Sequence, residues 1–97
     1  MSAVNALKEF LITFQFITKA GKVIAFQEKL ELPSIDEMDI FYTLRYAARR
    51  TGEFDDIQGV SHLRVYVRAD KEKYKVHEIC EAYCMLNFNE HLNEMRT

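Results

Sequence analysis

Large apolar side chains recur at every second position from Phe10 to Leu32, and this pattern constrains the fold more than any other feature of the sequence. Strands that bury one face have this period, because successive side chains point to opposite sides of a sheet. In both halves of the stretch the apolar set occupies even-numbered positions, namely Phe10, Ile12, Phe14 and Phe16, then Ile24, Phe26, Leu30 and Leu32. We therefore predict two paired strands that form an antiparallel hairpin.

The same parity predicts the register of the hairpin. Residues that face each other on one side of the sheet must have numbers with an even sum, which requires a loop with an odd number of residues. A three-residue loop that ends at Gly21 meets this condition and suits the left-handed conformation of that position. Phe14 is then expected opposite Phe26, and Ile12 opposite Glu28. A carboxylate on the apolar face needs a bulge, a frayed strand end or a basic partner, and a functional buried acid is the alternative.

A capped helix is predicted after Pro33, which ends the second strand. Ser34 and Glu37 have the types and spacing of a capping box, in which each side chain accepts a hydrogen bond from the other's backbone N–H. Gly52 is a natural end for this helix. Residues at three- and four-residue spacing share one helix face, which we expect in the core: Ile40, Phe41, Leu44, Ala47 and Ala48. The other side of the helix carries Tyr42, Arg45, Tyr46 and Arg49.

Alternation returns between Ser61 and Ala69 and predicts a third strand. The acidic segment before it, residues 53–59, is expected to be a loop that Phe54 and Ile57 anchor to the core. One side of the strand carries Leu63, Val65 and Val67, and the other carries His62, Arg64, Tyr66 and Arg68.

The segment after Asp70 has two interpretations. Tyr74 and Val76 form a short fourth strand, or Asp70 caps a helix that continues into the C-terminal segment. In both cases the spacing of the apolar residues favours a helix over about Ile79–Met95. Two asparagines weaken this prediction, and an extension of the sheet through residues 83–88 is the alternative.

These elements predict one α+β domain over residues 1–97, with an antiparallel sheet of three or four strands, two helices packed on one face, and the order β-β-α-β-(β)-α. A hydrophobic content of 48% fits a packed globular chain. A net charge of −2 excludes a strongly basic nucleic-acid binder and a heavily acidic DNA mimic. No stretch resembles a targeting signal or approaches the roughly 20 apolar residues that span a bilayer, so we expect a cytoplasmic protein without membrane contact.

Four residues of the types that bind zinc occur in the C-terminal part: His77, Cys80, Cys84 and His91. On one straight helix His77 and His91 would lie about 21 Å apart, whereas zinc ligands lie within about 2.3 Å of a single ion. We therefore expect no metal site, and two free, buried thiols in a reducing compartment. Ser34 already has a capping role, and Cys80 and Cys84 lie on an apolar helix face, where burial raises the pKa of a thiol. No glycine-rich loop precedes a helix, so neither an enzyme nor a cofactor is predicted.

Nucleic-acid binding is one hypothesis for the polar side of the third strand. The residues concerned are His62, Arg64, Tyr66 and Arg68. They would offer two guanidinium groups for phosphates beside a ring on which a base can stack. Arg45 and Arg49 add positive charge if the fold brings them near. Against this hypothesis, acidic and basic residues interleave here, and a charged strand face is commonly the solvated side of a half-covered sheet.

Protein binding is the hypothesis that we favour. With both helices on one side, the other face of the sheet stays open and mixes apolar with polar side chains. Aromatic and arginine residues such as Tyr66, Arg64 and Arg68 are enriched at binding hot spots, and an exposed strand edge offers a route to a homodimer. We expect a non-enzymatic regulator or inhibitor, of the kind that phages or mobile elements encode, with another protein as its partner.

Overall fold

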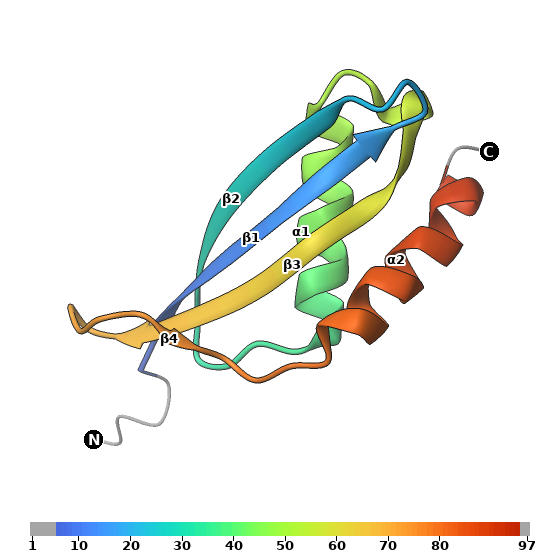
Figure 1. The fold of residues 1–97 in the computed structure, drawn as a ribbon. Coiled ribbons are helices and arrows are strands. Elements are labelled where there is room, and N and C mark those ends of the chain that lie inside the picture. The colour runs from blue at the N-terminus through green and yellow to red at the C-terminus, as the bar shows by residue number, and fades with distance from the viewer. Residues whose placement is uncertain (1–5, 96–97) are drawn as a thin grey trace.

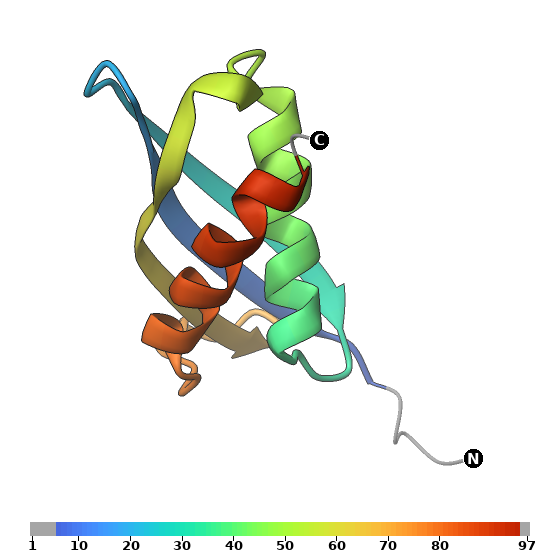
Figure 2. The ribbon, with the colours of Figure 1, turned by 90° about the vertical axis from the view of Figure 1, so that its right-hand side faces the viewer.

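The structure is a computed structural model and describes residues 6–95. Its strands are β1 (Lys8–Thr18), β2 (Val23–Leu32), β3 (Ile57–Ala69) and β4 (Lys75–Val76). Its helices are α1 (Glu37–Arg50) and α2 (Glu81–Met95), and a short 3-10 helix, η1 (Phe54–Asp56), precedes β3. The strands form an antiparallel sheet in the order β2-β1-β3-β4, with both helices on one face (Figure 1 and Figure 2). The predicted α+β architecture is confirmed.

The β1–β2 hairpin has the predicted register. Its three-residue loop is closed by a hydrogen bond from the Thr18 N–H to the Lys22 carbonyl at 2.9 Å, and Gly21 has a φ of +86°. A residue with a Cβ disfavours that left-handed conformation, which explains the glycine. Phe14 pairs with Phe26, and their rings stack with 5.6 Å between the centroids.

The core lies between the sheet and the two helices. Its fully buried residues from the central strand β1 are Phe10, Ile12, Phe14 and Phe16. The helices contribute Ile40, Leu44, Ala47 and Ala48 from α1, and Cys84, Phe88 and Leu92 from α2. The predicted core face of α1 is confirmed, with Phe41 half-buried at its border. The helix-facing residues of β2 are only half-buried, because β2 is an outer strand of the sheet.

The N-terminus of α1 differs from the prediction. Asp36 and Asp39 form the capping box, in place of Ser34 and Glu37. The Asp39 N–H donates to the Asp36 carboxylate and the Asp36 N–H donates to the Asp39 carboxylate, both at 3.0 Å. This later start leaves Ile35 immediately before the cap, where it packs against the core in the manner of a hydrophobic staple. Burial of Ile35 therefore favours the carboxylate cap over the hydroxyl cap.

The third strand also differs from the prediction. It begins at Ile57 rather than at Ser61, because residues 57–60 also pair with the end of β1, and Ile57 is fully buried. The expected loop is therefore shorter, although Phe54 does pack against the core as predicted. Between Ser61 and Arg64, β3 has one residue more than the paired segment of β1. This β-bulge places His62 at a φ of +57° and interrupts the strict alternation of the strand.

The C-terminal part follows the strand alternative. The two-residue strand β4 pairs with β3 at Tyr66 and Val67. Helix α2 begins at Glu81, so residues 83–88 are helical and do not extend the sheet. Cys80 lies before the helix and is exposed, and the expectation that both thiols are buried is therefore wrong for this residue. Among residues 6–95, no helix is long and apolar enough to cross a membrane.

Candidate protein-binding surfaces

The face of the sheet that points away from α1 and α2 is not covered by another element within residues 6–95 (Figure 2). We call this surface the open sheet face. Its side chains come from all four strands: Glu9, Leu11, Thr13, Gln15 and Ile17 of β1, Val23, Ala25, Gln27, Lys29 and Glu31 of β2, Arg64, Tyr66 and Arg68 of β3, and Val76 of β4. Cross-strand neighbours mix apolar and polar types, with Leu11 beside Tyr66 and Thr13 beside Arg64. The surface therefore has the mixed composition that was predicted.

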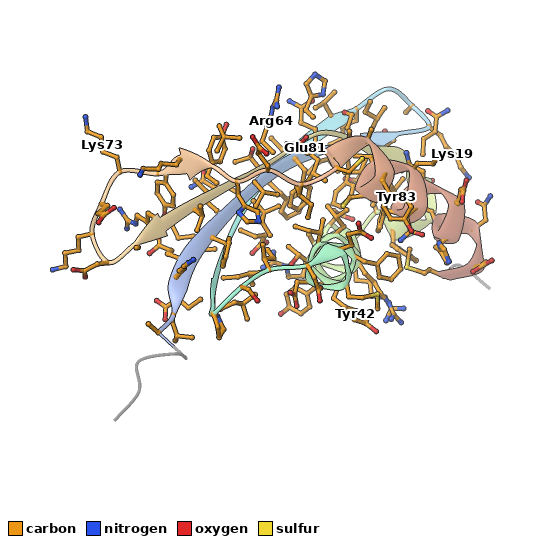
Figure 3. The ribbon with its side chains drawn as sticks, turned by 90° about the horizontal axis from the view of Figure 1, so that it is seen from below. Lys19, Tyr42, Arg64, Lys73, Glu81 and Tyr83 are labelled. Carbon is orange, nitrogen blue, oxygen red and sulfur yellow. The ribbon has the colours of Figure 1, made fainter. Side chains whose placement is uncertain are left out.

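The two arginines of the open sheet face are both paired with carboxylates. The guanidinium of Arg64 lies 3.8 Å from a carboxylate oxygen of Glu81, and the two side chains are neighbours in Figure 3. The guanidinium of Arg68 lies 3.2 Å from the Glu9 carboxylate and 4.6 Å from the centroid of the Tyr74 ring. The Arg64 side chain is 63% exposed and the Arg68 side chain 29% exposed. Arg64 therefore presents more charge to solvent than Arg68.

Tyr66 lies between these two arginines along β3. It is half-buried, and it pairs with Leu11 of β1 on one side and with Val76 of β4 on the other. Val76 is 62% exposed. We call Leu11, Tyr66 and Val76 the Tyr66 patch. An aromatic ring among aliphatic side chains, with charged groups around it, is the usual composition of the centre of a protein interface.

His62 borders the open sheet face from the β-bulge. Its ring Nδ1 lies 2.9 Å from the Ser61 hydroxyl oxygen. It lines a shallow hollow of about 510 Å³ together with residues of β1 and β2 that include Thr13, Gln15 and Gln27. His62 thus lies on the predicted surface but nearer the hairpin loop than the Tyr66 patch does.

Arg45 and Arg49 belong to the helical layer, on the other side of the sheet from Arg64 and Arg68 (Figure 2). Arg45 is half-buried on α1. The guanidinium of Arg49 lies 5.8 Å from the centroid of the Phe54 ring. The fold therefore separates these two arginines from the four predicted residues of β3.

A second surface, which was not predicted from the sequence, is a groove between β2 and α1. It has a volume of about 420 Å³, and its lining residues are Glu28, Leu30, Leu32, Asp39, Tyr42, Thr43 and Tyr46. We call it the β2–α1 groove. Tyr42 and Tyr46 are 53% and 64% exposed, and Figure 3 shows Tyr42 on the far side of the molecule from Arg64. The available signal was this pair of tyrosines one turn apart on the face of the helix predicted to lie outside the core.

Glu28 lies at one end of this groove, opposite Ile12 as predicted. Its carboxylate forms an ion pair with Arg50. The Arg50 guanidinium also lies 4.8 Å from the centroid of the Tyr46 ring and 5.8 Å from that of Phe26. A basic partner, one of the expected explanations, therefore compensates for the carboxylate on the apolar face of β2.

The four residues of zinc-binding type do not converge: Cys84 and Cys80 are one helical turn apart, and the two histidines contact other residues. Burial raises the pKa of the Cys84 thiol to about 11, so this thiol is protonated at neutral pH. The His77 ring packs edge-on against Phe10 with 5.5 Å between the centroids. The His91 Nδ1 lies 2.8 Å from the Asn87 carbonyl oxygen. In the described part of the chain, no three His, Cys, Asp or Glu residues come together as metal ligands would.

No protein-family model, curated protein or solved structure matches this chain. A function is therefore inferred from the open sheet face and the β2–α1 groove. Both combine aliphatic, aromatic and charged side chains at the surface, a combination that suits contact with another macromolecule.

Proposed function

We propose that this protein is a protein-binding module that docks onto its partner through the Tyr66 patch of the open sheet face. The observation that supports the proposal is the position of Tyr66, half-buried between Arg64 and Arg68, whose charges are paired with Glu81 and Glu9. Tyrosine and arginine are the residue types that dominate binding energy in protein interfaces. In this role the chain acts as a small regulator or inhibitor by occupying a surface of its partner.

Nucleic-acid binding receives less support from the same geometry. Affinity for a phosphate backbone depends on several cations that are free to replace counterions on one surface. The open sheet face has three cationic side chains, Lys29, Arg64 and Arg68, and they are accompanied by Glu9 and Glu31. The arginines of α1 lie on the other side of the sheet and add nothing to this surface.

Affinity capture of the tagged chain from its native cells tests the proposal, with the partner identified by mass spectrometry and its binding then measured with purified proteins. Tyr66→Ala is expected to weaken binding at least about tenfold, the effect of losing a hot-spot side chain. Tyr83→Ala is the control of the same residue type, because it removes an exposed tyrosine of α2 that lies outside the open sheet face (Figure 3). Circular dichroism of both variants establishes that the fold is retained.

A gel-shift assay with a single-stranded oligonucleotide provides the competing outcome. If the wild type binds the oligonucleotide in a salt-sensitive manner, and if Arg64→Ala with Arg68→Ala abolishes that binding, the surface is a nucleic-acid site. Equal binding of the protein partner by wild type and Tyr66→Ala would also contradict the proposal.

A further inference from the structure

The two edges of the sheet differ in how their backbone groups are satisfied. On the outer side of β3, the Val60 N–H donates to the side-chain carbonyl of Asn89 at 2.9 Å, and the Val65 carbonyl accepts from the His77 N–H at 2.9 Å. Strand β4 pairs with the next residues of β3. The edge formed by β2 has no such partner within residues 6–95. It is therefore the unprotected edge of the sheet.

The register shows which backbone groups of β2 point outward. Thr18 and Lys22 form a hydrogen-bonded pair at the loop, and in an antiparallel ladder hydrogen-bonded and non-hydrogen-bonded pairs alternate. The even-numbered residues of β2 therefore bond to β1. The odd-numbered residues direct their N–H and C=O groups to the free edge, and they are Val23, Ala25, Gln27, Lys29 and Glu31.

The β2–α1 groove runs alongside this free edge. Its strand wall is formed by the helix-facing side chains of Glu28, Leu30 and Leu32, all only half-buried. Its helix wall carries two exposed tyrosines, Tyr42 and Tyr46. A strand added to β2 would continue the sheet, so every second side chain of that strand would point to the helix side and enter the groove.

The two ends of the groove differ in whether their carboxylate is paired with a cation. Glu28 is compensated by Arg50 at one end. Asp39, at the other end, accepts a hydrogen bond from the Asp36 N–H, and in the described part of the chain no cationic side chain is paired with it. The end of the groove beside Asp39 therefore suits a positively charged side chain.

We propose that the free edge of β2 and the β2–α1 groove together bind an extended segment of another protein as an added antiparallel strand. The segment has apolar side chains at alternate positions, which enter the groove, and a lysine or arginine near its N-terminal end. Antiparallel addition places that end beside Leu32 and Asp39, because β2 runs toward Leu32. This site is distinct from the Tyr66 patch, which lies on the other face of the sheet.

A second copy of the chain fits this edge less well. A two-fold pairing centred on Gln27 would use the whole strand, but it would set Lys29 opposite Ala25 and Glu31 opposite Val23 of the other copy, so neither charge gains a partner. The pairing that sets Lys29 opposite Glu31 overlaps only over residues 28–32. A segment of a different protein can satisfy both the backbone and the charges.

The probe for the test is an acetylated and amidated peptide, Lys-Thr-Val-Thr-Val-Thr-Val, added at up to millimolar concentration to the isotope-labelled full chain. Amide hydrogen exchange by NMR is the readout. Saturating peptide should slow exchange at least about tenfold at the odd-numbered residues of β2, whose N–H groups are free, and should leave the even-numbered residues unchanged. Replacing the peptide lysine with glutamate should weaken binding about fivefold at low salt, and high salt should reduce this difference.

Two variants of one residue provide matched controls. Gln27→Pro removes an outward N–H that β1 does not use, so the hairpin is retained while strand addition is blocked. Gln27→Thr keeps the N–H and should bind like the wild type. Tyr66→Ala should also bind the peptide normally, which distinguishes this site from the proposed docking patch.

Four outcomes would overturn the inference. They are equal binding by Gln27→Pro and Gln27→Thr, no change of exchange at β2 with millimolar peptide, loss of peptide binding in Tyr66→Ala, and protection of β2 that rises with protein concentration in the absence of peptide. The last outcome would assign the edge to a second copy of the chain.

Discussion

The side-chain carbonyl of Asn89 in α2 accepts a hydrogen bond from the backbone N–H of Val60 in β3 at 2.9 Å. Val60 is on the part of β3 that β4 does not cover, so this contact satisfies an edge N–H with a helix side chain. Gly59 lies next to it, and a Cβ at that position would come within 3.0 Å of the Asn89 oxygen. A side chain at residue 59 would therefore require the Asn89 side chain to shift by a few tenths of an ångström from the position in which it accepts this hydrogen bond.

Asn89→Ala is expected to lower the free energy of unfolding by about 1 kcal/mol, because it leaves the Val60 N–H without its protein partner. Gly59→Ala should also destabilise, since the added Cβ displaces the Asn89 side chain. Urea denaturation measures both effects. The double variant should be less destabilised than the sum of the single variants, because both remove the same hydrogen bond. Glu90→Ala, on the exposed side of α2, is the control and should be nearly neutral.

Arg50→Ala is expected to lower the free energy of unfolding by about 1 kcal/mol. It leaves the Glu28 carboxylate unpaired on a half-buried apolar face, and it removes the contact between the Arg50 guanidinium and the Tyr46 ring. Urea denaturation at low and high salt measures this loss, which should be smaller at high salt because salt screens the ion pair. Glu28→Leu introduced together with Arg50→Ala should recover most of the stability, as expected when an ion pair is replaced by apolar side chains. An equal cost for Arg49→Ala would contradict this explanation.

The pKa of the Cys84 thiol, raised from 9.0 to about 11 chiefly by burial, predicts a loss of stability at alkaline pH. The unfolded chain loses this proton near pH 9, whereas the folded chain holds it until about pH 11. The stability that the protonated Cys84 thiol contributes is therefore fully present below pH 9, and it is lost as the pH rises to about 11. Denaturation across this range should show a decline that is smaller in Cys84→Ala. Cys80→Ala retains the buried Cys84 thiol and should show most of the decline of the wild type, because burial is the largest cause of the raised pKa and Cys80 a smaller one.

His62→Val is expected to destabilise the protein by about 1 to 2 kcal/mol, because a β-branched residue fits poorly at a φ of +57°. His62→Asn should be close to neutral, since asparagine tolerates this conformation. Thermal or urea unfolding of the variants provides the comparison. Gln58→Val is the control at an exposed position of β3 without positive φ, and a similar loss there would show that the bulge is not the cause.

The hairpin, its register and the buried face of α1 could all be predicted from the residue pattern. These features depend on residues close together in the chain: the parity of the apolar set, the left-handed glycine at position 21 and the three- and four-residue spacing of a helix. Gly52, predicted to end α1, does have a φ of +74° just after the helix. The opposition of Ile12 and Glu28 follows from the same register.

Four features depend on contacts in the folded protein and could not be predicted: the cap of α1, the bulge in β3, the exposure of Cys80 and the location of the β2–α1 groove. The cap depends on the burial of Ile35 in a core built from other segments, and the bulge on fitting β3 to β1. Arg50 meets Glu28 across 22 positions of the chain, and Asn89 meets Val60 across 29. Alternation and helical spacing describe near neighbours along the chain, so they carry no information about which distant residues meet or which sheet edge stays unprotected.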